Sequence, residues 1–216
     1  MTVFIGMVSQ KGGVGKSTLS RLIAREYAEA GWSVKIADLD VSQGTCFDWQ
    51  SRRLEHAITP DVPVERFGNI SQALKVAHVY DLLIFDGKPY ATSQTLDIAK
   101  SCDLLILPTG LSLDDLRPSV LLARELCDKG IPHKKISFAF CRVGDSEAEL
   151  EEAHRYIRDA GYSAFEHAMP EKTAYRRASD IGRSPTETRF ATLNTKADRL
   201  AQNIIDRVTD LQREKV

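Results

Sequence analysis

The feature that most constrains this 216-residue chain is a glycine-rich segment, QKGGVGKST, at residues 10–18. It follows a nearly continuous apolar run at residues 3–8 and opens an amphipathic stretch at residues 17–30 that ends before Gly31. A strand, a glycine-rich turn and a helix in this order are typical of a phosphate-binding P-loop, because glycines let successive backbone N–H groups curl around phosphate oxygens. The helix N-terminus adds the positive end of its dipole. The segment therefore predicts a nucleotide site on an α/β fold.

The residues of this loop have distinct expected roles. Lys16 can reach the β- and γ-phosphates, and the Ser17 hydroxyl can bind Mg²⁺. The general pattern begins with glycine, whereas this chain has Gln10 at that position and a second lysine, Lys11, beside it. The nucleotide-binding residues that we expect here are Lys11, Gly12, Gly13, Val14, Gly15, Lys16, Ser17 and Thr18.

The remaining chain alternates short apolar runs with longer amphipathic stretches. Runs that are almost entirely apolar indicate strands covered on both faces of a parallel sheet. This rhythm predicts an α/β fold, a doubly wound and mostly parallel sheet flanked by helices, in one P-loop domain over residues 1–216. The expected strands cover residues 3–8, 34–37, 82–85, 104–107 and 136–140, with an edge strand at 62–67. The expected helices cover residues 17–30, 114–129, 146–160 and 194–213.

Two acidic motifs come at the ends of expected strands. Asp38 and Asp40 follow the second run, and Asp86 follows four apolar residues in the pattern of a Walker B motif. Carboxylates at the carboxyl ends of parallel strands face the ligand crevice of such a sheet. We therefore expect Asp40 to orient water or to support Mg²⁺, and Asp86 to lie next to the ion.

The Lys-Gly-Gly-Val-Gly-Lys-Ser form of the loop resembles the deviant Walker A motif of the ParA/MinD family of ATPases. The resemblance implies ATP or ADP and Mg²⁺ as ligands and a homodimer with ATP, in which Lys11 reaches the partner's nucleotide. It implies catalytic roles for Lys11, Lys16 and Asp40 and metal contacts from Ser17, Asp40 and Asp86. Family members commonly have Asp-x-Asp-Pro-Gln after the second strand, whereas this chain has Val41 and Ser42 where one proline usually stands.

Two later segments extend the resemblance over residues 3–190. Residues 107–114 look like the loop that leads into an interface helix, and residues 169–175 look like the nucleotide-base region. By position, Pro170 and Glu171 would line the adenine site, with Arg142 near the base. Cys141 departs from the Asn or Thr that relatives often carry before this arginine.

Charge and composition separate the possible uses of such an ATPase. The net charge is −1, but residues 172–216 contain ten Lys or Arg and six Asp or Glu. ParA-type relatives bind double-stranded DNA non-specifically as ATP dimers, and a ParB-like centromere-binding protein stimulates them. The expected DNA-binding residues are Arg176, Arg177, Arg183, Lys196 and Arg199, with Arg189 as a further basic residue of this region.

Alternatives remain a MinD-like membrane-cycling ATPase, another cargo-positioning ATPase and a metabolic ligase or reductase on the same scaffold. Residues 209–216 have mixed charge and no aromatic residue, so stable membrane insertion is not expected. The four cysteines form no CxxC pair, which disfavours an iron–sulfur reductase. A ligase would not need Lys11. With no basic leader and no apolar run near 18 residues, we expect a cytoplasmic, nucleoid-associated protein.

Overall fold

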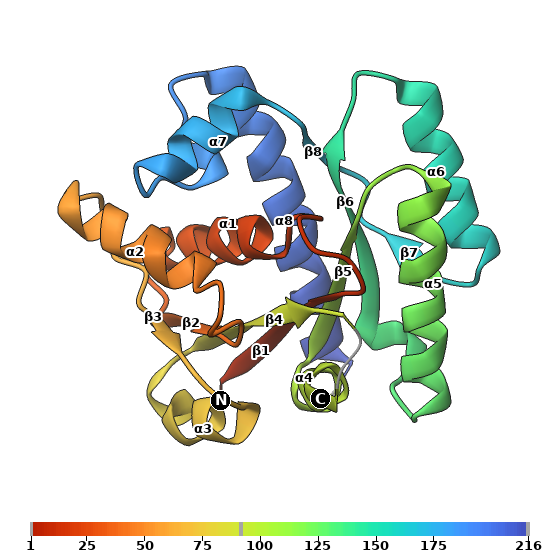
Figure 1. Cartoon of the computed structure of the whole chain (residues 1–216), viewed down its shortest axis with the longest axis horizontal. Coiled ribbons are helices and arrows are strands. Elements are labelled where there is room, and N and C mark those ends of the chain that lie inside the picture. Colours follow the sequence, from red (N-terminus) through yellow and green to blue (C-terminus); the bar gives the residue numbers. More distant parts are fainter. Residues whose placement is uncertain (1, 91–92, 215–216) are drawn as a thin grey trace.

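The computed structural model describes residues 2–90 and 93–214 and contains a parallel sheet flanked by helices (Figure 1). The strand order is β3-β2-β4-β1-β5-β6-β7, with β8 paired to β6, and every strand pair is parallel. The doubly wound α/β fold is therefore confirmed. The strands are β1 (Val3–Ser9), β2 (Val34–Asp38), β3 (Val64–Arg66), β4 (Leu82–Pro89), β5 (Leu104–Thr109), β6 (Ile136–Val143), β7 (Ser163–Ala164) and β8 (Met169–Pro170).

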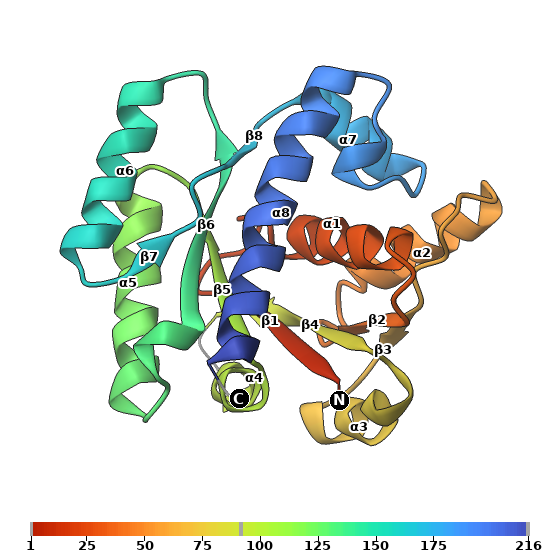
Figure 2. The same cartoon turned by 180° about the vertical axis from the view of Figure 1, so that it is seen from behind.

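The helices cover both faces of the sheet (Figures 1 and 2). One apolar core joins the sheet to α1 and α8, and the other joins it to α3, α4, α5 and α6. The helices are α1 (Lys16–Glu29), α2 (Thr45–Glu55), α3 (Ile70–Val76), α4 (Ser93–Ser101), α5 (Leu113–Asp128), α6 (Glu147–Asp159), α7 (Thr173–Asp180) and α8 (Ala191–Arg213). Three short 3₁₀ turns are η1 (Ala77–Val79), η2 (His133–Lys135) and η3 (Pro185–Glu187).

Strands in the middle of the sheet are apolar on both faces because helices cover both. Residues of β4 alternate between the two cores, with Leu82 and Ile84 in one and Leu83 and Phe85 in the other. The apolar stripe of α8 packs in the first core, where its four residues are almost fully buried, namely Leu200, Ile204, Val208 and Leu211. This stripe is therefore a packing surface between α8 and the sheet.

The strand register brings the acidic motifs together at the carboxyl ends of the strands. Asp38 pairs with Asp86 across β2 and β4, and Met7 pairs with Asp86 across β1 and β4. Strand β2 ends at Asp38, so Asp40 belongs to the loop that follows and not to the strand end. The expected edge strand is present but shorter, at Val64–Arg66.

Four helices, α2, α3, α4 and α7, have no counterpart among the sequence-based predictions. Helix α1 begins at Lys16, one residue before the predicted start, and α8 begins at Ala191, three residues earlier than predicted. Over residues 2–90 and 93–214, no helix combines the length and apolar character needed to cross a membrane. Lys215 and Val216, which end the tail considered for membrane contact, lie outside the described residues.

Candidate nucleotide-binding site

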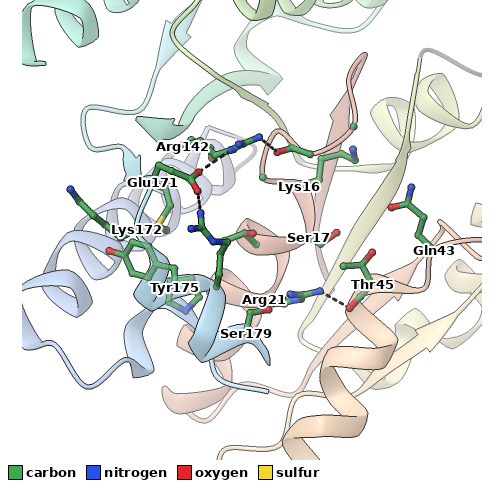
Figure 3. A pocket seen from close by; sticks show the side chains of 18 of the residues that line it. Lys16, Ser17, Arg21, Gln43, Thr45, Arg142, Glu171, Lys172, Tyr175 and Ser179 are labelled. Atoms are coloured by element: carbon green, nitrogen blue, oxygen red, sulfur yellow. Dashed lines mark hydrogen bonds and ion pairs between the residues drawn. The ribbon is translucent and has the colours of Figure 1, made fainter. Parts of the chain in front are cut away.

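A pocket lies at the carboxyl ends of the strands, between the P-loop and α7 (Figure 3). It is lined by the P-loop and α1, by the loop after β2, by the end of β4 and β6, and by the segment from β8 to η3. The P-loop, α1 and the β2 and β4 loops contribute Gly12, Gly13, Gly15, Lys16, Ser17, Thr18, Arg21, Asp40, Gln43, Thr45, Gly87 and Pro89. The remaining walls contain Cys141, Arg142, Met169, Pro170, Glu171, Lys172, Tyr175, Arg176, Ser179, Asp180, Arg183 and Pro185.

The P-loop backbone has the conformation that an anion cradle needs. Gly13 and Gly15 have positive φ angles of 75° and 111°, which glycine adopts without the steric cost of a Cβ. A Cβ on Gly15 would lie 2.9 Å from the side chain of Cys141. Among the described residues no side chain caps the start of α1, so the first N–H groups of that helix are available to a ligand. The loop therefore fits the phosphates of a nucleotide.

Lys16 lies at the centre of this cradle with its ammonium group largely buried. Its Nζ donates to Ser9 Oγ at 3.0 Å. Burial lowers the pKa of Lys16 from its ordinary value, while the nearby carboxylates of Asp86 and Asp40 act in the opposite direction. An anionic ligand would add negative charge beside this ammonium group and favour its protonated form.

The carboxylates around the pocket have different surroundings. Asp86 is 2% exposed, accepts from Ser20 Oγ at 3.2 Å and contacts Cys46 Sγ at 3.1 Å. Asp86 does not line the pocket, whereas Ser17 and Asp40 do. An oxygen donor set of a serine hydroxyl and carboxylates fits Mg²⁺, which binds oxygen ligands and keeps several waters.

Asp38 supports the loop and does not line the pocket. Its carboxylate accepts from the backbone amides of Asp40 and Cys46, both at 3.1 Å, and of Phe47 at 3.2 Å. Burial and the charge of Asp86 raise the pKa of Asp38 to about 6, although the three amide hydrogen bonds oppose this. Asp38 therefore connects the end of β2 to the start of α2 across the loop that contains Asp40.

Asp40 is held at the head of a tight turn. Its Oδ1 accepts from Ser42 Oγ at 2.6 Å and from the Gln43 amide at 3.3 Å. Its carbonyl accepts from the amides of Gln43 and Gly44 at 3.1 and 2.7 Å. Asp40 is 9% exposed and lines the pocket.

Lys11 points away from the pocket of its own chain. Its Nζ forms an ion pair of 2.8 Å with Asp115 Oδ1 near the start of α5, and its side chain is 43% exposed. The hydrogen bond from Lys11 is the main reason that the pKa of Asp115 is lowered. Among the expected nucleotide-binding residues of the loop, Lys11 and Val14 do not line the pocket, whereas the other six do.

At the other end of the pocket, Glu171 lies between two arginines (Figure 3). Arg142 donates from Nε to Glu171 at 2.9 Å and from Nη1 to the Gly13 carbonyl at 3.3 Å, while Arg176 pairs with the other oxygen of Glu171. Arg142 has a φ of 59°, which is uncommon for a residue with a side chain. Arg142, Pro170 and Glu171 all line this pocket.

Several lining residues were not predicted, and Arg21 is the most connected of them. Its guanidinium donates to Ser179 Oγ at 2.7 Å and to the Thr45 carbonyl, and thus joins α1 to α7 and to the start of α2. Arg21 follows Ser17 by four residues, a spacing that places both on one face of a helix. This spacing is a signal that sequence analysis could have used.

The predicted DNA-binding residues do not form one surface. Arg176 and Arg183 line the nucleotide pocket. Arg177 and Arg183 line a second hollow beside α7, and Lys196 and Arg199 line a third between α6 and α8. In residues 2–90 and 93–214, none of these five except Arg176 has an ion pair.

The family model for the CobQ/CobB/MinD/ParA nucleotide binding domain matches residues 5–213. No curated protein sequence is significantly similar to this chain. Among solved structures, MinD of Pyrococcus horikoshii OT3 complexed with Mg-ADP has a TM-score of 0.74 at 17% identity, covering 94% of this chain and 96% of that chain. A McdA–ATP complex of Cyanothece has a TM-score of 0.71 at 14% identity, covering 94% and 96%.

A third structure is a Borrelia burgdorferi B31 protein described as a plasmid partition protein and bound to AMPPNP. Its TM-score is 0.68 at 14% identity, and the alignment covers 100% of both chains. These similarities show the P-loop NTPase fold. The chain belongs to the CobQ/CobB/MinD/ParA nucleotide-binding family, whose ParA/MinD branch the P-loop sequence had indicated.

Proposed function

We propose that this protein is a single-domain, ATP-dependent dimerising switch ATPase for plasmid or chromosome partition. It binds non-specific DNA in its ATP state, and a ParB-like centromere-binding partner stimulates it in a cytoplasmic, nucleoid-associated setting. The observation that carries the proposal is Lys11, which does not line the pocket of its own chain but is held by Asp115 at the surface, where the phosphates of a second copy could draw it away. Nucleotide or Mg-nucleotide in the solved relatives supports the choice of ligand.

ATP hydrolysis follows from the groups around the cradle. Glycine amides and Lys16 hold the phosphates, and the carboxylate of Asp40 accepts a hydrogen bond from the attacking water. The hydrogen bond from Ser42 fixes one oxygen of Asp40 and leaves the other for this water. Mg²⁺, when bound with Ser17, Asp40 and Asp86, would neutralise negative charge that develops on the phosphates.

The dimer is supported by the surface around Lys11. The loops after β2 and β4 and the first residue of α5 expose apolar side chains, namely Val41 at 46%, Tyr90 at 68% and Leu113 at 66%. A second copy facing these loops would bury them and receive Lys11 on its phosphates. A cation at that position stabilises transition-state charge as an arginine finger does. After hydrolysis, the lost γ-phosphate contacts release the loops that follow Asp40 and Asp86 and open the dimer.

DNA binding is supported by basic residues that lie outside the nucleotide pocket. Arg177 is exposed on α7, and Lys196 and Arg199 are exposed near the start of α8. Dimerisation doubles the number of these basic residues. Charges that contact phosphates release counterions, so binding must weaken as salt rises. Because Arg176 and Arg183 also line the nucleotide pocket, their substitution would not separate DNA contact from nucleotide contact.

The test is fluorescence anisotropy of a labelled random-sequence duplex, titrated with protein under ATP, ADP and no nucleotide at two salt concentrations. We expect salt-sensitive binding with ATP alone, which the combined Arg177→Ala, Lys196→Ala and Arg199→Ala variant loses while it still binds ATP. Arg158→Ala, at an exposed position on α6, is the control. No DNA binding in any state would refute the partition role and favour a protein- or membrane-positioning ATPase or a metabolic enzyme, and liposome co-sedimentation would separate these.

A further inference from the structure

The turn that carries Asp40 contains no proline. Proline would fix one backbone φ near −65°. Here Val41, Ser42 and Gln43 occupy the turn, and all three are exposed. The turn closes through the amides of Gln43 and Gly44 on the Asp40 carbonyl. Within the turn, Asp40 is therefore held by hydrogen bonds, including those from Ser42 Oγ and the Gln43 amide to its carboxylate, and not by buried side chains.

Arg66 lies next to this turn although it is distant in sequence. It is the last residue of edge strand β3 and pairs in register with Asp38, two residues before Asp40. The Phe67 amide donates to the Asp38 carbonyl at 3.0 Å, so the end of β3 is fixed to the end of β2. The side chain of Arg66 can therefore extend over the residues that follow β2.

The guanidinium of Arg66 contacts both the turn and the first turn of α2. It occupies the space where a Cβ on Gly44 would lie, so a side chain at residue 44 would displace the guanidinium. Its Cζ lies 4.4 Å from the ring centroid of Phe47, and its Nη2 donates to Asp48 Oδ1 at 2.9 Å. The cation–π contact with Phe47 and the ion pair with Asp48 together hold the guanidinium beside Gly44.

We propose that Arg66 is a positioning residue for Asp40, which it holds through Gly44 from outside the nucleotide pocket. The proposal rests on the proposed role of Asp40 in orienting water. Arg66 does not line the pocket, so it acts on neither the nucleotide nor the water directly. A displacement of about 1 Å in a catalytic group can lower the rate about 100-fold, so losing this support affects turnover more than binding.

The first test compares Arg66→Ala with the wild type in ATP turnover, in affinity for a fluorescent ATP analogue and in thermal stability. Arg158→Ala, which removes another exposed arginine with an ion pair, is the matched control. We expect Arg66→Ala to lower kcat at least tenfold while the dissociation constant of the analogue changes less than about twofold. An unchanged kcat, or equal losses of kcat and affinity, would overturn the positioning role.

A double-substitution cycle separates positioning from general stability. If Arg66 acts through Asp40, the variant with Asp40→Ala and Arg66→Ala turns over as slowly as Asp40→Ala alone. If Arg66→Ala lowers kcat by the same factor in the Asp40→Ala background as in the wild type, the proposal is refuted. Should Asp40→Ala hydrolyse ATP at the wild-type rate, the proposed function of Asp40 itself would fail, whereas a normal rate in Arg66→Ala alone defeats only this inference.

A second variant approaches the same contact from the turn. Gly44→Ala adds a Cβ in the space of the guanidinium at a residue with a φ of 56°. We expect it to lower kcat as Arg66→Ala does, with analogue affinity retained. If Arg66→Ala unfolds the protein, this variant decides the matter, because a wild-type kcat in Gly44→Ala would contradict the contact's role.

Discussion

Replacing the buried Arg53 with methionine tests how α2 is joined to the segment that closes the pocket. Arg53 has no exposed side-chain surface and forms two hydrogen bonds with the carboxylate of Glu187, at 2.7 and 2.9 Å. It also donates to the carbonyls of Gly182 and Pro60. Without Arg53, the carboxylate of Glu187 keeps, among the described residues, only the longer ion pair with Arg25, at 3.4 Å, and the Ser184 amide. Breaking a buried pair in this way costs about 3–5 kcal/mol of unfolding free energy.

For a chain of this size, each kcal/mol corresponds to about 2–4 °C in melting temperature, so Arg53→Met should melt roughly 10 °C below the wild type. Thermal and urea unfolding at pH 7 measure the difference. Lys134→Met, which removes an exposed ion pair with Glu214, is the control and should change stability by less than about 1 kcal/mol. If Arg53→Met lowers the unfolding free energy no more than Lys134→Met does, the buried ion pair does not stabilise the fold as argued.

The pH dependence of stability tests the contribution of the Arg53–Glu187 pair independently. Burial alone raises the pKa of Glu187, but the hydrogen bonds from Arg53 and the Ser184 amide, with the charges of Arg53 and Arg25, hold it below its ordinary value. A lowered pKa in the folded state gives stability that is present above the usual glutamate range near 4.3 and is lost as pH falls. The difference in unfolding free energy between the wild type and Arg53→Met should therefore become smaller below about pH 4.

Three further predictions address the cradle, the ion pair of Lys11 and the role of α8. Lys16→Ala should abolish binding of a fluorescent ATP analogue without lowering the melting temperature, and retained affinity would contradict the P-loop assignment. Asp115→Asn should release Lys11 and lower the protein concentration for half-maximal ATP-dependent dimerisation by up to about fivefold, as expected for a partly exposed ion pair. Analytical ultracentrifugation measures this concentration, and an unchanged or higher value would contradict the prediction. Leu200→Ala should lower the unfolding free energy in urea by about 2–5 kcal/mol, because Leu200 is fully buried against the sheet, and an effect below 1 kcal/mol would contradict that packing.

The core of the fold was predictable because the strands carry their own signal. Runs such as residues 82–85 are apolar throughout, and helices on both faces explain why. Helix α7 has only eight residues, too few for a hydrophobic period to be recognised, and α2 follows the acidic motif in a stretch whose apolar residues are sparse. Such elements depend on tertiary contacts more than on local pattern.

The candidate site also contains parts that the sequence predicts and parts that depend on tertiary contacts. The phosphate cradle is contiguous in sequence, so its residues could be named before its geometry was known. The contact between Arg142 and Glu171 joins residues 29 apart, and the bond from Arg21 to Ser179 joins residues 158 apart. The separation of the basic residues onto different hollows also depends on which side of α7 each one occupies, because Arg176 and Arg177 are neighbours in sequence but line different cavities.

The most direct test of the switch is the mass in solution of Asp40→Ala, which should bind ATP but hydrolyse it slowly. Light scattering after size exclusion should give about twice the 24.1 kDa of one chain with ATP and Mg²⁺, and one chain with ADP. Adding Lys11→Ala to this variant should return the ATP state to a monomer, since Lys11 then no longer reaches the partner's phosphates. A monomer with ATP, or a dimer that forms equally with ADP and without Lys11, would contradict the proposed mechanism.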